Sequence, residues 1–291
     1  MIHQLENNNF SVKINGIGAE LCSFIAKKTG VEYVWQGNPT YWGSTAPVLF
    51  PIIGALKDGV FIHNAQEFAV PKHGFIRHNE NLQIHRKLDH EITFSLASSE
   101  ELKKSYPFDF QFNITFTLKD NVLEVSHKVV NTGKDDLWFS LGGHPAFNCP
   151  LLPNEKYDDY YLDFNQEVSL STTVLSAKGL LTDEHFEVIS KGRELGLSEE
   201  LFANDALIFK DIESKKVSLK SKNHSHGLAV SFTDFKNLGV WAKYRAPFVC
   251  IEPWLGVTDH QNTNGVFMEK EGIIGLPKGE KFMAKFEIEV F

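Results

Sequence analysis

Cysteine, positive charge and long apolar runs are all scarce in this chain of 291 residues. The cysteines, Cys22, Cys149 and Cys250, are odd in number and far apart, and none belongs to a C-x-x-C pair. This pattern argues against a disulfide framework and against a structural zinc site. The first six residues also lack the basic and apolar regions of a secretory signal. We therefore expect a reducing, cytoplasmic environment.

The charge and the apolar runs exclude two further classes of protein. The formal net charge is −8, so general binding to nucleic acid or to an acidic membrane is not expected. The longest nearly unbroken apolar stretch, residues 46–56, contains two prolines and a glycine. It is well below the roughly 20 residues that a membrane-spanning helix needs. The sequence predicts no membrane span.

Helical patterns are rare as well. Ser99, Glu100 and Glu101 resemble the start of a helix, which Pro107 would stop after about two turns. Residues 198–202 predict one more helical turn. Neither a Gly-rich phosphate loop nor a strand–helix–strand rhythm is present, so a nucleotide-binding fold is not predicted.

What the chain has in abundance is phenylalanine, with 24 residues, and strict alternation of apolar and polar positions. Residues 92–96, 108–118, 122–130 and 282–290 all alternate, which is typical of antiparallel strands with one buried face. No linker or repeat divides the sequence. We expect residues 1–291 to form one all-β domain, a large antiparallel two-sheet β-sandwich with a few short helices. His127 falls on an apolar strand face and is expected to be a satisfied core histidine.

Three segments interrupt the alternation with residues that carry chemistry. Residues 70–78 place His73 and His78 beside Lys72 and Arg77. Residues 141–148 place His144 between Gly142-Gly143 and Pro145, and residues 248–256 place Glu252 and Trp254 after an apolar run. Each segment also has an ordinary interpretation: an exposed basic loop, a histidine in a tight turn, and a buried Glu paired with Arg245 or Lys243.

The chemical interpretation rests on the position of His144 at a strand end and on the burial of Glu252. Pro145 donates no backbone hydrogen bond, so we expect His144 at a strand end, facing a cleft. Burial raises the pKa of a carboxyl group, which would bring Glu252 toward the range that suits general acid–base catalysis. The ring of Trp254 could offer a flat face to a sugar.

Taken together and in this order, the three segments resemble the aldose 1-epimerase (galactose mutarotase) family, most closely its LacX-type branch. The motifs that carry the resemblance are His73-Gly74-Phe75, Gly142-Gly143-His144-Pro145 and Cys250-Ile251-Glu252-Pro253-Trp254. The resemblance covers most of the chain, from residue 46 to residue 256. It implies the galactose mutarotase-like fold, a large sandwich called a supersandwich, with the site in a cleft on one sheet.

The resemblance also implies an activity, the interconversion of the α and β anomers of an aldohexose or hexose phosphate. Glu252 matches the general base that takes the proton of the anomeric hydroxyl, and His144 matches the general acid that protonates the ring oxygen. His73 and Asp205 match residues that contact the sugar. Because one carboxylate and one or two histidines suffice for these proton transfers, no cofactor and no metal is expected.

The groups that bind the substrate depend on which cations face the site. Relatives tend to carry Arg near the position of Ala55, and Lys57, Lys72 and Arg77 could replace that missing cation. The same cations suggest that a sugar phosphate can bind, since Arg offers two donors to phosphate oxygens.

The sequence is also compatible with two other functions and with one assembly. One alternative is a carbohydrate-binding or regulatory protein that keeps the fold without turnover. The missing Arg argues mildly for it, whereas Glu252 and His144 argue for an enzyme. A glycosidase would need a second carboxylate beside Glu252, such as Asp259. An exposed edge strand at residues 281–291 could pair two copies into a homodimer.

Overall fold

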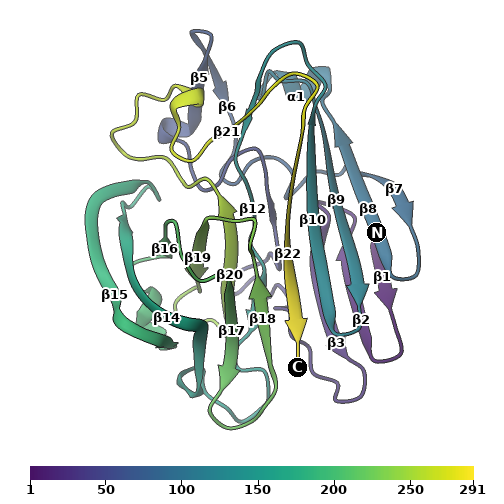
Figure 1. Ribbon diagram of the computed structural model, residues 1–291, viewed down its shortest axis with the longest axis vertical. Helices are drawn as coiled ribbons and strands as arrows, with labels where there is room; N and C mark the ends of the chain where they lie inside the picture. Colours follow the sequence, from purple (N-terminus) through teal and green to yellow (C-terminus); the bar gives the residue numbers. More distant parts are fainter.

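The computed structural model describes all residues from Met1 to Phe291, and it is built almost entirely of antiparallel strands (Figure 1). The all-β expectation is confirmed. The single α-helix, α1 (Glu100–Lys103), is shorter than predicted, although Ser99 caps it by accepting a hydrogen bond from the Leu102 N–H. The other helical segments are 3₁₀ turns: η1 (Lys57–Gly59), η2 (Tyr157–Asp159), η3 (Glu199–Phe202) and η4 (Phe267–Glu269). None of these helices has the length and apolar character needed to cross a membrane.

A nine-stranded sheet forms one layer of the molecule. Its order is β15-β14-β17-β18-β22-β10-β9-β8-β7. In that order the strands are Leu181–Gly196, Tyr160–Leu175, Lys216–Ser221, Gly227–Ser231, Lys281–Val290, Val122–Asn131, Phe110–Lys119, Glu91–Ala97 and Gln83–Lys87. The alternating segments 108–118 and 122–130 form β9 and β10, which pair as a hairpin with Val125 opposite Phe116. The expectation of an edge strand at residues 281–291 is wrong, because β22 pairs on both sides, with β18 and β10.

A six-stranded sheet forms the second layer. Its order is β16-β19-β20-β12-β4, and β13 also pairs with β20. In that order, with β13 last, the strands are Leu207–Phe209, Asn237–Trp241, Phe248–Leu255, Leu141–Gly143, Val48–Leu49 and Ala146–Asn148. Every residue of β20 is buried, as its apolar run predicts.

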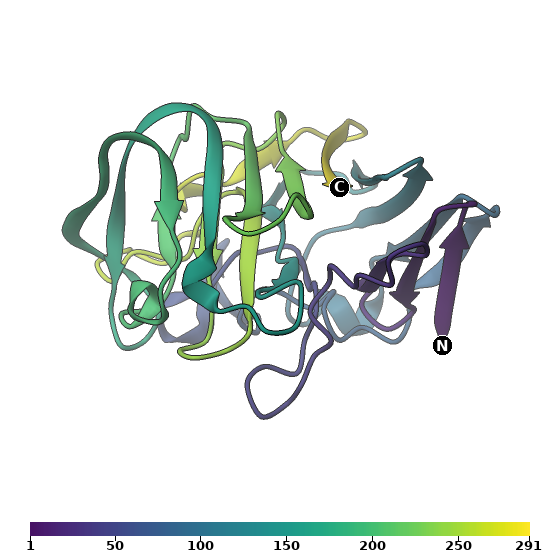
Figure 2. The same cartoon turned by 90° about the horizontal axis from the view of Figure 1, so that it is seen from below.

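Three small sheets complete the fold. A three-stranded sheet of β1 (Ile2–Glu6), β2 (Phe10–Asn15) and β3 (Glu20–Ala26) lies at the N-terminus. It sits at the end of the molecule that carries β7 and β8 (Figure 2). Two-stranded pairs join β5 (Val60–His63) to β6 (Gln66–Ala69), and β11 (Leu137–Phe139) to β21 (Ile274–Leu276).

The two large sheets pack on each other through aromatic side chains. The rings of Phe50, next to β4, and Phe112, on β9, lie 4.9 Å apart between centroids. Gly143 on β12 lies so close to Phe286 on β22 that a Cβ there would be 2.8 Å from the ring. One face of the six-stranded sheet is therefore closed by the nine-stranded sheet, while Gly142, one residue earlier, belongs to the opposite face.

His127 lies in the core as expected, among the rings of Phe112, Phe235 and Phe286. The expectation of a satisfied histidine is wrong, because neither ring nitrogen has a hydrogen-bond partner.

Candidate active site

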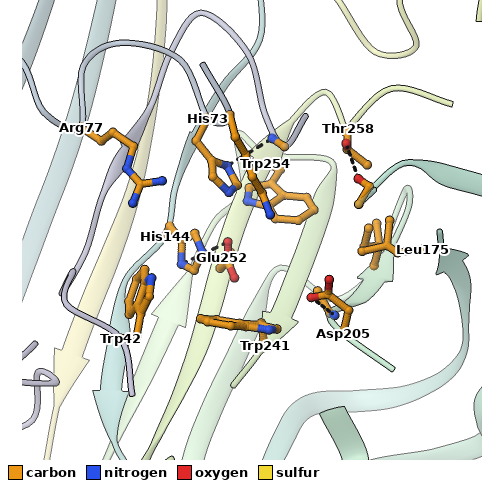
Figure 3. Close-up of a pocket in the computed structure, with 15 residues that line it drawn as sticks. Trp42, His73, Arg77, His144, Leu175, Asp205, Trp241, Glu252, Trp254 and Thr258 are labelled. Carbon is orange, nitrogen blue, oxygen red and sulfur yellow. Dashed lines mark hydrogen bonds and ion pairs between the residues drawn. The ribbon is translucent and has the colours of Figure 1, made fainter. Parts of the chain in front are cut away.

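A pocket of about 240 Å³ opens on the free face of the six-stranded sheet (Figure 3). Alternation along the strands explains which side chains reach it. Glu252 and Trp254 share one face of β20, and their partners on β19 are Gly239 and Asn237. The residues that line the pocket are Trp42, Gly54, Lys72, His73, Arg77, His144, Leu175, Gly179, Asp205, Ala206, Ile208, Trp241, Glu252, Trp254 and Thr258.

Two glycines allow the Trp254 indole to lie against the sheet. A Cβ on Gly239 would be 2.5 Å from Cζ2 of Trp254, and one on Gly142 would be 2.9 Å from its Cδ1. A larger residue at either of these two positions would push the ring away. Because only 5% of Trp254 is exposed, it forms a wall of the pocket more than a platform for a ligand.

Glu252 and His144 meet inside the pocket. Oε2 of Glu252 lies 3.3 Å from Nδ1 of His144 (Figure 3). Both atoms are buried and neither has a hydrogen-bond partner elsewhere in the protein. The ordinary interpretation of Glu252 as an ion-pair partner of Arg245 or Lys243 fails. Its only ion-pair contact is with His144, and Arg245 pairs with Glu199 instead.

Burial shapes the protonation of this pair. It raises the pKa of the Glu252 carboxyl well above its usual value, although nearby Lys72 acts in the opposite direction. It lowers the pKa of His144 to about 3, with Arg77 and Lys72 adding repulsion. Both groups therefore favour their neutral forms.

His73 faces the same pocket from a strained loop. Its backbone has a φ of 68°, and its Nδ1 accepts a hydrogen bond from the Gly54 N–H at 3.2 Å. In the neutral ring the proton must then lie on Nε2, which leaves Nε2–H as a donor. Burial holds the pKa of His73 well below its usual value, and repulsion from the neighbouring His144 lowers it further.

Two tryptophans that the sequence analysis did not identify enclose His144. The Trp42 ring stacks on the imidazole, with centroids 4.9 Å apart and an angle of 27° between the planes. Trp241 meets the same imidazole edge-on at 5.8 Å. Trp241 lies at the boundary of the pocket between His144 and Asp205 (Figure 3). Its side chain is only partly buried, so it offers more open aromatic surface than Trp254.

Lys72 and Arg77 lie on different sides of the pocket. Nη2 of Arg77 donates to Oγ of Ser44 at 3.3 Å, and its Nε is buried without a partner. Nζ of Lys72 instead lies beside Gly179, 3.9 Å from where a Cβ would stand. Neither cation forms an ion pair with a carboxylate of the protein.

The structure does not bring Lys57 into the pocket, which corrects the expectation that it lies near the sugar. Lys57 belongs to the turn η1, where its backbone N–H donates to Asp259 and its Nζ donates to the Thr263 carbonyl. Ala55 is absent from the pocket lining as well. Its N–H donates to Oγ1 of Thr258, so the missing cation is not replaced from this segment.

The remaining polar groups complete the far wall. Asp205 has a φ of 81° and lines the pocket from the loop before β16. Asp259, the second carboxylate of a possible glycosidase, is 5% exposed and engaged by the Lys270 ammonium at 2.5 Å. It does not line the pocket.

One group of side chains could hold a metal ion. Ligand atoms of His144, Cys250 and Glu252 all lie within 4.8 Å of one another. Cys250 shares the pocket face of β20 with Glu252, yet its side chain is fully buried beneath it. Lys72 and Arg77 flank this trio, and their charge opposes a bound cation.

Comparison with known proteins finds relatives over most of the chain. The family model for aldose 1-epimerase matches residues 1–274. The plasmid-encoded protein LacX of Lactococcus lactis subsp. lactis is 33% identical over 280 residues, which cover 93% of each chain. The chromosomal LacX of the same organism is 32% identical over 280 residues.

Solved structures show the same fold. A galactose mutarotase related enzyme from Lactobacillus acidophilus superposes with a TM-score of 0.93 at 34% identity, covering 100% of this chain and 97% of that one. A galactose mutarotase-like protein from Lactobacillus casei also gives 0.93, at 29% identity and with both chains fully covered. The match extends through β12 and β20, which carry the pocket. The chain therefore belongs to the aldose 1-epimerase family.

Proposed function

We propose that the protein is an aldose 1-epimerase that interconverts the α and β anomers of an aldohexose or hexose phosphate. The observation that carries the proposal is the contact between Glu252 and His144 in a pocket lined by aromatic and polar side chains. The family match supports it, since that family is named for this reaction.

The reaction needs two proton transfers and no redox chemistry. Glu252 takes the proton of the C1 hydroxyl while His144 gives a proton to the ring oxygen, O5, and the C1–O5 bond opens. Rotation about C1–C2 and reclosure then yield the other anomer. The Nε2–H of His73 supplies a hydrogen bond to the sugar, and Asp205 accepts from ring hydroxyls on the opposite side.

The cations of the pocket support a hexose phosphate as one substrate. Lys72 and Arg77 lack carboxylate partners, in a protein whose formal net charge is −8. A phosphate dianion would satisfy the buried Nε of Arg77, and Arg donates two parallel hydrogen bonds to such an anion. Lys72, near Gly179, remains available for a sugar hydroxyl.

Polarimetry of freshly dissolved α-D-glucose and α-D-galactose tests the activity, with a coupled assay for α-glucose 6-phosphate. The wild type should accelerate equilibration. Glu252→Gln and His144→Ala should each lose about 10²–10⁴-fold, the usual worth of a positioned acid or base. A wild type no faster than buffer on all three sugars, while calorimetry still detects binding, would instead favour a carbohydrate-binding protein.

Arg77→Ala tests the phosphate role in the same assays. It should impair turnover of glucose 6-phosphate far more than that of glucose. An equal effect on both sugars would remove Arg77 from phosphate recognition, and Lys72→Ala serves as the matched comparison from the other side of the pocket.

A further inference from the structure

Glu252 and His144 contact each other directly, although a separate base and a separate acid would each need to contact only the sugar. Oε2 of Glu252 and Nδ1 of His144 face each other at 3.3 Å, both buried and both without another partner. The other oxygen of Glu252 and the other nitrogen of His144 are not among the buried unpaired atoms, and both residues line the pocket. The two side chains therefore form a continuous path from one point of the pocket to another.

We propose that Glu252 and His144 act as one neutral proton relay, in which a protonated Glu252 passes its proton to His144 while it accepts another from the sugar. This inference rests on the proposed epimerase function and specifies how its two proton transfers are joined. The resting pair holds one proton on Oε2 of Glu252 and one on Nε2 of His144.

The proton and electron balance closes within one step. The C1 hydroxyl gives its proton to Oε1 of Glu252, and the O–H electron pair forms the C1=O double bond. The C1–O5 bond breaks and its electrons go to O5, which takes the Nε2 proton of His144. The Oε2 proton of Glu252 moves to Nδ1 of His144. Reclosure of the ring runs the same transfers backwards and restores the starting pair.

The surroundings favour a neutral relay over a separated ion pair. Glu252 is 1% exposed and His144 is 7% exposed, so water cannot stabilise charge on either. The charged and titratable groups facing the pair are Lys72, His73 and Arg77 from the 70–78 segment, Asp205 from the loop before β16, and Cys250 on β20. Burial raises the pKa of Glu252 and lowers that of His144, in the direction that the relay needs.

A protonated carboxyl group can accept a proton from the sugar only if it gives up its own proton at the same time. The relay to His144 provides that second transfer. With an ionised Glu252 as base, kcat would rise as pH rises through the pKa of Glu252. With the relay, kcat is level while the pair holds its shared proton and falls as pH rises through that same pKa. The two mechanisms therefore predict opposite slopes of kcat against pH.

Infrared difference spectroscopy of the wild type against Glu252→Gln tests the resting state without any turnover. At neutral pH the difference should contain the carbonyl stretch of a protonated carboxylic acid. Asp163→Asn is the matched control, because Asp163 is 3% exposed but bonded to Arg193 and Lys220, which lower its pKa. That variant should remove a carboxylate band instead. A carboxylate band for Glu252 would overturn the relay, whether or not the protein turns sugars over.

The kinetic test counts the protons that move in the step. In mixtures of H₂O and D₂O, kcat should curve downward with deuterium fraction, as two or more moving protons require. A straight line, or a kcat that rises with pH through the Glu252 pKa, would overturn the relay while leaving the epimerase function intact. A wild type that does not accelerate mutarotation at all would contradict the proposed function itself.

Discussion

At the scale of single residues, the state of His144 depends on an aromatic neighbour. The Trp42 ring covers one face of the imidazole and is itself held by Phe248, stacked at 5.6 Å, and by Trp241 at 5.5 Å. The Trp35 Nε1–H donates to the Trp42 carbonyl at 3.0 Å, which fixes the loop. Trp42 therefore keeps water from the imidazole and fixes the ring plane.

Replacing Trp42 should change His144 in a predictable direction. Trp42→Ala admits water, so the pKa of His144 should rise from about 3 toward the usual value of 6.5. The ring also loses its fixed plane, and kcat should fall by about 10²-fold, the cost of a misplaced catalytic group. NMR titration of the imidazole protons and polarimetry measure the two effects.

Two further variants separate aromatic stacking from simple filling of space. Trp42→Phe keeps an aromatic ring against the imidazole and should preserve most of the activity. Trp42→Leu still excludes water but cannot stack, and this variant should lose the activity. Unchanged kcat and an unchanged His144 titration in Trp42→Ala would contradict this role.

Sequence could identify some of these residues and not others. Glu252, His144 and His73 stand in segments that interrupt the alternation, and the structure brings all three into one pocket. Trp42 and Trp241 carry no such local signal, because their role arises only where a loop near the N-terminus meets β19. For Lys57 the sequence is misleading. It is close to the histidine motif in sequence, but its hydrogen bonds to Asp259 and Thr263 hold it outside the pocket.

At the scale of elements, the pocket wall depends on how the β14–β15 hairpin is fastened. Leu175 and Gly179, at the tip of this hairpin, line the pocket. Thr258 joins the tip to the 54–57 segment: its Oγ1 donates to the Gly179 carbonyl at 2.8 Å and accepts from the Ala55 N–H at 2.9 Å. One hydroxyl therefore connects three segments that are distant in sequence.

Thr258→Val keeps the shape of this side chain and removes the hydroxyl. The Ala55 N–H and the Gly179 carbonyl then lose a partner, which should lower the free energy of unfolding by about 1–3 kcal/mol. The wall should loosen and KM should rise several-fold with a smaller change in kcat. Urea denaturation and polarimetry measure these effects, and Thr258→Ser, which keeps the hydroxyl, should restore KM. An unchanged KM in Thr258→Val would show that the wall does not depend on this bond.

The regular strands were the elements most open to prediction. Alternation located β8, β9, β10 and β22, because each buries one face against the other sheet. It could not tell that β22 is an interior strand, since pairing partners depend on topology. The β14–β15 hairpin was also missed, because repeated register shifts interrupt its pattern.

At the scale of the whole molecule, buried histidines should make the fold sensitive to acid. Burial lowers the pKa of His127 to about 4, of His144 to about 3, and of His73 well below its usual value. The unfolded chain therefore binds more protons than the folded protein as pH falls below 6.5. This contribution to stability is complete above pH 6.5 and is lost as pH falls toward the folded pKa values.

His127→Phe isolates one of these histidines away from the pocket. From pH 7.5 to pH 5, His127 should cost the wild type about 2 kcal/mol of unfolding free energy, and the variant should be spared that loss. Glu252 acts in the opposite direction, but equally in both proteins. Urea denaturation at the two pH values measures the difference. Equal pH dependence in both proteins would contradict the prediction.

The most direct test of the central claim observes anomer exchange itself. Magnetisation transfer between the α and β anomeric protons of glucose, galactose and glucose 6-phosphate at equilibrium reports interconversion without any coupling enzyme. We expect rapid exchange with the wild type on at least one of these sugars, and exchange slower by about 10²–10⁴-fold with Glu252→Gln. Exchange at the buffer rate with the wild type on all three sugars, or full exchange with Glu252→Gln, would contradict this expectation.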